Sequence, residues 1–77
     1  MKNTIYLHFK NMLICESKDL KKNNPKDKAY IRYSLNNCLD DYIRTLNNYH
    51  VLRDRLTQKR ADLYANWLTN LVCRLHP

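Results

Sequence analysis

Glycine is absent from all 77 residues of the chain. Phosphate-binding loops, dinucleotide-binding turns and the strained turn that carries the nucleophile of many hydrolases all depend on glycine. Only glycine lets the backbone come close to a ligand or adopt a positive φ at low cost. Two-residue β-hairpins also lose their preferred turn residue. The missing glycine therefore argues against nucleotide-dependent enzymes and against tight hairpins. Together with frequent leucine and few isoleucines or valines, it favours helix.

The length of the chain limits it to a single domain, which we assign to residues 1–77. A chain this short buries only about 60% of the surface that its unfolded form exposes, so its core is small. The adjacent carboxylates Asp40 and Asp41 would point to different sides of a helix, and the three histidines are scattered. Neither set forms a pattern for acid–base catalysis. We therefore predict that the protein is not an enzyme and uses no cofactor.

The cysteines Cys15, Cys38 and Cys73 are odd in number and widely spaced, which is not a disulfide framework. Only Cys73 and His76 have a spacing that places two metal ligands on one helical face, and no second pair accompanies them. We predict free thiols, no metal and a reducing compartment. The sequence has neither an apolar run long enough to span a membrane nor a signal-peptide pattern, so we expect a soluble cytoplasmic protein without membrane contact.

The first segment, residues 4–15, fits two kinds of secondary structure. In a helix, Ile5, Phe9 and Leu13 share one face, whereas Leu7 points away from it. In a strand, Ile5, Leu7 and Phe9 alternate with polar neighbours. Short apolar runs are not settled by periodicity alone. We favour the helix, and an α+β fold with short N-terminal strands followed by helices stays open.

Residues 17–28 contain almost no apolar side chains, and we interpret them as a basic connecting segment. Asn24 can cap a helix and Pro25 suits the first helical position, so a helix is expected to begin there. The lysines of the segment are Lys18, Lys21, Lys22, Lys26 and Lys28.

Beyond Pro25, apolar residues recur at spacings of three and four, as they do on one face of a helix. Asn47–Asn48 is the expected break, and a long C-terminal helix is expected at residues 50–75. A strand at residues 29–35, with the helix beginning at Asn37, is the alternative. The predicted packing residues are Ile31, Leu35, Leu39, Tyr42, Leu46, Tyr49, Leu56, Leu63, Trp67, Leu71 and Leu75.

The sequence thus predicts an all-α protein, a small bundle of two to three helices with a long C-terminal helix. The apolar stripe from Ile31 to Leu75 is long for a core of this size. We therefore predict that the chain forms a homodimer or packs against a partner of another kind.

Fourteen lysines and arginines face seven aspartates and glutamates, which gives a net charge of +7. Such an excess points to acidic partners, although a solvated surface that serves solubility alone is the alternative. The densest basic run is residues 53–60. On one continuous helix, Arg55 and Lys59 would be outward-facing neighbours. The candidate contacts with an anionic partner are Arg53, Arg55, Lys59, Arg60, Arg32 and the five lysines of residues 17–28.

Aromatic side chains lie among these cations, and Tyr6, Tyr30 and Tyr33 are candidates for stacking on bases. Two functions fit this pattern. The first is a small nucleic-acid-binding regulator. The second is a protein inhibitor or adaptor that docks on a nucleic-acid-processing complex, for example a phage or mobile-element anti-defence protein such as an anti-CRISPR.

Overall fold

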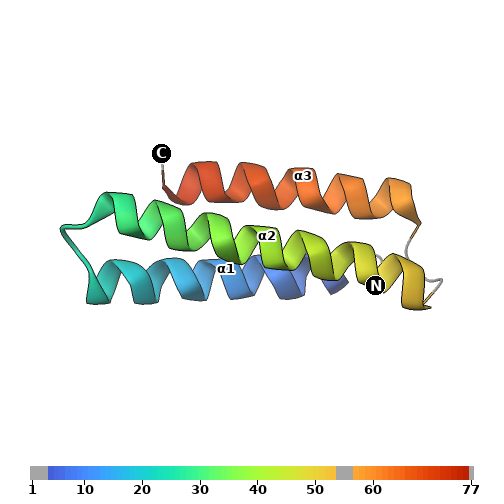
Figure 1. Cartoon of the computed structure of the whole chain (residues 1–77), viewed down its shortest axis with the longest axis horizontal. Helices are drawn as coiled ribbons and strands as arrows, with labels where there is room; N and C mark the ends of the chain where they lie inside the picture. The colour runs from blue at the N-terminus through green and yellow to red at the C-terminus, as the bar shows by residue number, and fades with distance from the viewer. Residues whose placement is uncertain (1–3, 54–56, 77) are drawn as a thin grey trace.

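The computed structural model describes residues 4–53 and 57–76, with side chains described for residues 4–48 and 57–76. The described residues form three helices and no strand. The helices pack side by side into a rod of 42 × 20 × 18 Å (Figure 1). The second helix runs antiparallel to the other two, and the helices are α1 (Thr4–Asn23), α2 (Lys28–Arg53) and α3 (Gln58–Leu75). The predicted all-α bundle is confirmed, and the α+β alternative is wrong.

Helix α1 contains the segment whose secondary structure the sequence left open. Phe9 and Leu13 are buried in the core, and Leu7 is 48% exposed, as the helical periodicity predicts. A helix places Phe9, Leu13 and Ser17 one above the other, so that a single face packs against both α2 and α3. This continuous inner face decides the ambiguity in favour of helix.

The basic connecting segment predicted at residues 17–28 is shorter than expected. Helix α1 continues to Asn23, and only residues 24–27 connect it to α2. The reason is that Ser17 is buried and Leu20 packs against the core, so the inner face of the helix extends into the run of lysines. Most of the lysines are therefore held on helices rather than on a loop.

Asn24 and Pro25 form a turn and do not start the helix. The N–H of Asp27 donates to the carbonyl of Asn24 at 3.2 Å, which places Pro25 at the second position of a turn that favours proline there. Asp27 caps α2 instead, because its carboxylate accepts a hydrogen bond from the N–H of Tyr30 at 3.0 Å. Helix α2 therefore begins at Lys28, three residues later than predicted.

The predicted break at Asn47–Asn48 and the predicted helix over residues 50–75 are also wrong. Helix α2 runs through both asparagines to Arg53, and its 26 residues make it the longest helix. The side-chain amides of both asparagines are exposed to solvent, so the helix continues without burying them. Helix α3 has only 18 residues, and Thr57 is its N-cap: the Thr57 hydroxyl accepts a hydrogen bond from the N–H of Arg60 at 3.2 Å.

All three helices contribute to one hydrophobic core. Of the predicted packing residues, five on α2 (Ile31, Leu35, Leu39, Tyr42 and Leu46) and Leu71 on α3 are buried, and Trp67 and Leu75 are partly buried. Leu63 is 41% exposed, so its predicted place in the core is wrong. The side chain of Tyr49, and Leu56 as a whole, lie outside the described residues.

The buried face of α3 is rotated from the predicted one, and its members are Ala61, Tyr64, Leu68, Leu71 and Val72. The predicted face assumed one helix over residues 50–75 that continues the apolar stripe of α2. Because α3 is a separate helix that begins at Gln58, its buried face is set by how it packs against α1 and α2. Because the chain folds back on itself, α2 and α3 cover much of each other's apolar surface. Most of the apolar stripe that suggested a homodimer is thus buried against helices of the same chain.

Two contacts tie the end of α3 to the other helices. The ammonium of Lys21 donates to the carbonyl of Leu75 at 2.9 Å, and Nε2 of His76 lies 3.0 Å from the carbonyl of Lys28. The Leu75 carbonyl is one of the last four of the helix, which have no partner within it. A cation at this end also interacts favourably with the helix dipole.

We expect the substitution Lys21→Met to lower the free energy of unfolding by about 0.3–1 kcal/mol, because it removes the charge at the end of α3 but keeps most of the apolar stem. Urea unfolding followed by circular dichroism measures the change. Lys22→Met is the control, since the next residue of α1 points about 100° away from α3. An equal loss in both variants contradicts a specific role for the Lys21 contact.

Candidate nucleic-acid interface

The end of α3 lies beside the connection between α1 and α2, and together they form one strongly basic end of the bundle (Figure 1). We call this the turn end and define it as residues 17–32 and 71–76. It holds seven lysines and arginines against two aspartates, a net charge of +5 out of +7 for the chain. The seven are Lys18, Lys21, Lys22, Lys26, Lys28, Arg32 and Arg74.

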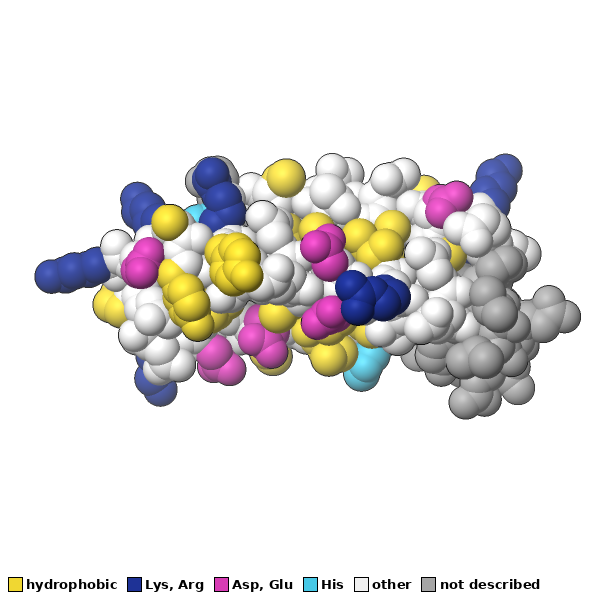
Figure 2. Space-filling model, viewed as in Figure 1, with side chains coloured by type: hydrophobic (Ala, Val, Ile, Leu, Met, Phe, Trp, Pro, Cys, Tyr) yellow, Lys and Arg dark blue, Asp and Glu magenta, His cyan; other side chains and the backbone are white. Residues whose placement is uncertain are grey.

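All seven basic side chains of the turn end are exposed. Figure 2 shows lysine and arginine side chains projecting from this end of the rod in several directions. Six of the seven are candidates that the sequence had already provided, and folding brings them to one place. Arg74 was missed, because a basic residue in the last turn of a helix is ordinarily explained by the helix dipole alone. Only the topology places Arg74 beside the lysines of α1.

Only part of the predicted basic cluster at residues 53–60 falls within the described residues. Lys59 and Arg60 are exposed in the first turn of α3. The side chain of Arg53, and Arg55 as a whole, lie outside the described residues. The backbone of Thr57 is extended and α3 begins at Gln58, so Lys59 lies on a helix that starts after residue 57, and the predicted pairing with Arg55 lies outside the described residues. Lys59 and Arg60 therefore belong to the opposite end of the bundle from the turn end.

Two of the three candidate stacking tyrosines are freely presented. Tyr30 is 47% exposed and Tyr33 is 65% exposed, both in the early turns of α2 next to the cations of the turn end. Tyr6 is only partly buried, but it packs against α3, with its ring centroid 5.9 Å from that of Tyr64 and 4.9 Å from that of Trp67. Exposed aromatic rings beside cations are what a nucleic-acid surface uses for stacking.

Four of the six acidic side chains in the described residues lie on α1 and α2, namely Glu16, Asp19, Asp40 and Asp41. Figure 2 shows several of them on the face where α2 lies in front. Burial raises the pKa of the Cys38 thiol, and the negative charges of Glu16 on α1 and Asp41 on α2 raise it further. Asp41 also pairs with Arg44 at 3.8 Å. Acidic side chains thus accompany basic ones on the middle of the bundle, and the excess of positive charge is at the turn end.

The same region gives Tyr42 an unusual titration. Tyr42 is 8% exposed and stacks on Phe9, with ring centroids 5.2 Å apart. Burial, followed by Cys38, Glu16 and Asp41, raises the pKa of its phenol to about 12 from 10.0. The folded state thus keeps the phenol proton at a pH where the unfolded state has released it.

We expect this raised pKa to make the protein lose stability at high pH. The stabilisation is complete below the unfolded pKa of 10.0 and is lost as the pH rises towards about 12, because the unfolded state then binds fewer protons. Urea unfolding of the wild type and of Tyr42→Phe, measured across that window, isolates the effect from lysine titration. The wild type should lose more stability than Tyr42→Phe, and parallel losses contradict the assignment.

The surface has three hollows of interest. One, between α1 and α3, is lined by Tyr6, Trp67, Asn70 and Arg74. A second, between α2 and α3 at the turn end, is lined by Arg32, Asn36, Val72, Cys73 and His76.

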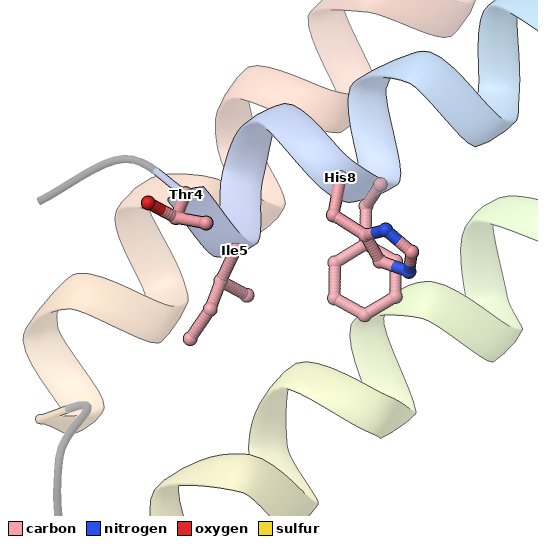
Figure 3. A pocket seen from close by; sticks show the side chains of 4 residues that line it. Thr4, Ile5 and His8 are labelled. Carbon is pink, nitrogen blue, oxygen red and sulfur yellow. The ribbon is translucent and has the colours of Figure 1, made fainter. Parts of the chain in front are cut away.

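The third hollow lies at the start of α1 and contains no lysine or arginine. Its lining residues are Thr4, Ile5, His8 and Phe9. Figure 3 shows Ile5 pointing from the first turn of α1 into the space beside the other two helices, with His8 one turn further on. This mostly apolar hollow is not suited to a phosphate, whereas the first two each contain an arginine.

The cysteines and histidines do not assemble into a metal site within the described ranges, where no three His, Cys, Asp or Glu side chains come together. Cys15, Cys38 and Cys73 are free thiols. The Nε2 of His76 faces the carbonyl of Lys28 and must donate to it, because a carbonyl only accepts. The Cys73–His76 pair, the first candidate for ligands by spacing, thus has its histidine engaged in holding α3 to α2.

The chain matches no protein-family model, no curated protein and no solved structure. None of its helices, over the residues that the structure describes, is both long and apolar enough to cross a membrane. What the chain does must therefore be inferred from the charge and shape of its own surface, and the turn end is the most distinctive part of that surface.

Proposed function

We propose that the protein is a small, non-catalytic nucleic-acid-binding regulator that contacts the phosphate backbone through its turn end. The observation that carries this proposal is the concentration of seven basic side chains and two acidic ones at one end of a rod about 20 Å wide. A nucleic acid offers closely spaced negative charges, and each neutralised phosphate releases a counterion. An extended array of phosphates therefore fits this end of the bundle.

The kind of side chain at the turn end also favours nucleic acid. Five of the seven cations are lysines, which on flexible stems act as adaptable point charges. Such side chains hold the backbone of a nucleic acid without reading its sequence. The exposed rings of Tyr30 and Tyr33 next to these cations add surfaces on which bases can stack.

The proposal is tested by isolating the tagged chain from the cell that expresses it, with and without nuclease treatment. We expect nucleic acid to copurify with the chain, and partners recovered with it to disappear after nuclease treatment. Recovery of one protein in constant ratio despite nuclease contradicts the proposal and supports the inhibitor or adaptor.

The homodimer and the cytoplasmic location stay predictions. Light scattering of the purified chain tests the homodimer, and fractionation of the cell that expresses it tests the location.

A further inference from the structure

We propose that the groove between α1 and α3 binds a single-stranded segment of nucleic acid and that one of its bases stacks on Trp67. The proposal deepens the proposed function and rests on it. It assigns a ligand class, an unpaired strand, to a groove that shares Arg74 and Lys21 with the turn end but places the bases on Trp67.

The groove presents an aromatic ring that is held in place. It has a volume of about 500 Å³ and is lined by Tyr6, Trp67, Asn70 and Arg74. The ring of Tyr6 meets that of Trp67 at 73° with centroids 4.9 Å apart, and Tyr64 lies behind, 5.5 Å from Trp67. Trp67 is partly buried, so these neighbours fix its indole while part of it still faces the groove.

The three groups beside one another on α3 match the face of a base, the edge of a base and a phosphate. The indole of Trp67 offers a flat surface for a base, which is sequence-tolerant because every base has a π-face. The amide of Asn70, an exposed side chain, both donates and accepts and can pair with a base edge. The guanidinium of Arg74 suits a phosphate.

Charge along the groove is of one sign. Its lining residues include Arg74 and no aspartate or glutamate. Beyond the hollow, the helical spacing of three and four continues the stripe of Tyr6 along α1 and that of Trp67 along α3. Among the described residues, no aspartate or glutamate occupies these positions. Their basic members are Lys10, Lys21, Arg60 and Arg74.

The basic residues are spread along the length of these two helices. The two helices run parallel (Figure 1), and Arg60 and Arg74 are about 20 Å apart along α3 at 1.5 Å per residue. A strand of several nucleotides can therefore follow the groove to the turn end, which Arg74 shares.

The position of the aromatic ring explains why the strand should be unpaired. Bases in a duplex are stacked on their neighbours and reach a protein pocket only after they are flipped out, which costs free energy. A single strand presents its bases at little cost. A partly buried indole on a groove floor can therefore stack on a base of a single strand, and a duplex can contact only the exposed cations.

Trp67 is the only tryptophan of the chain, so its fluorescence reports directly on the groove. The full chain is titrated with oligothymidine of about ten nucleotides, within the usual site size for single strands, and with a duplex of the same length. A dye on the oligonucleotide reports total binding by anisotropy. We expect oligothymidine to quench the tryptophan fluorescence at saturation, and the duplex to bind without quenching.

Variants of the groove locate the contact. Trp67→Ala should weaken binding of oligothymidine about 5- to 100-fold, the range for loss of one stacked base, and Trp67→Phe should restore most of the affinity. Because Trp67 packs partly in the core, Asn70→Ala provides a second variant at an exposed position, with Asn66→Ala, also exposed on α3, as its matched control. Circular dichroism checks that each variant is folded.

The outcomes separate this inference from the proposed function. Salt-dependent binding without quenching, with equal affinities for Asn70→Ala and Asn66→Ala, overturns the groove assignment and leaves the proposed function intact. Loss of stacking affinity in Tyr33→Ala instead of Trp67→Ala has the same meaning, because it moves the bases to α2. Absence of binding to either oligonucleotide overturns both.

Discussion

Replacing Leu35 by alanine should cost about 2–5 kcal/mol of folding free energy, the range for removing a buried leucine. Leu35 is fully buried in the middle of the face that α2 turns to the other helices. A 77-residue domain is expected to have a total stability of only about 4–12 kcal/mol. The variant should therefore be largely unfolded at moderate urea concentration, which circular dichroism and the urea midpoint measure.

The matched control for this variant is Leu63→Ala on α3. Leu63 belongs to the stripe that the sequence predicts as packing surface, but it is 41% exposed in the bundle. Its replacement should change the unfolding free energy by no more than about 0.5 kcal/mol, because alanine is also the better helix former. A loss as large as that of Leu35→Ala contradicts the observed rotation of α3.

The second large effect concerns binding. Replacing Lys18, Lys22 and Lys26 together by alanine should lower the affinity for an oligonucleotide about a hundredfold near 0.1 M salt. It should also reduce the slope of log K against log salt by about one unit for each phosphate that is no longer neutralised. All three side chains are exposed, so the fold should be unchanged. Anisotropy titrations at several salt concentrations measure both quantities.

The control for the triple variant removes positive charge elsewhere on the bundle. Arg44 lies on the middle of α2 paired with Asp41, and Lys59 lies on the first turn of α3. We expect Arg44→Ala with Lys59→Ala to reduce affinity only slightly, through the smaller net charge. A loss comparable to that of the triple variant indicates that binding follows net charge and not the turn end.

The sequence predicted the class of fold because the spacing of its apolar residues is a local property. Ile31, Leu35 and Leu39 recur with the helical period whatever they pack against, and the core face of α2 follows from that alone. The absence of glycine is also a local property, and it correctly favoured helices over tight hairpins. The positions at which helices end depend on tertiary packing, and these are the predictions that were wrong.

Asn47 and Asn48 illustrate this dependence. Asparagine favours caps and turns, which suggested a break, but both side chains face away from the core, where they disturb the helix little. The real start of α3 is marked by Thr57, a threonine followed by good helix formers. That signal was present in the sequence, but it lay within a run of charges that was interpreted as one helical face.

The candidate site was predictable residue by residue but not as an assembly. A net charge of +7 and the lysines of α1 already pointed to an anionic partner. The contribution of Arg74 and the groove beside Trp67 depend on α3 lying parallel to α1, which no local pattern specifies. Long-range topology therefore supplied what spacing did not.

The most direct test of an anion-binding turn end is the salt dependence of the affinity of the full chain for an oligonucleotide, measured between about 50 and 200 mM salt. If the exposed cations neutralise at least about four phosphates, log K should fall linearly with log salt with a slope of about −3 or steeper. A slope near zero, or no binding at the lowest salt concentration, contradicts the proposal that the turn end binds the phosphates of a nucleic acid.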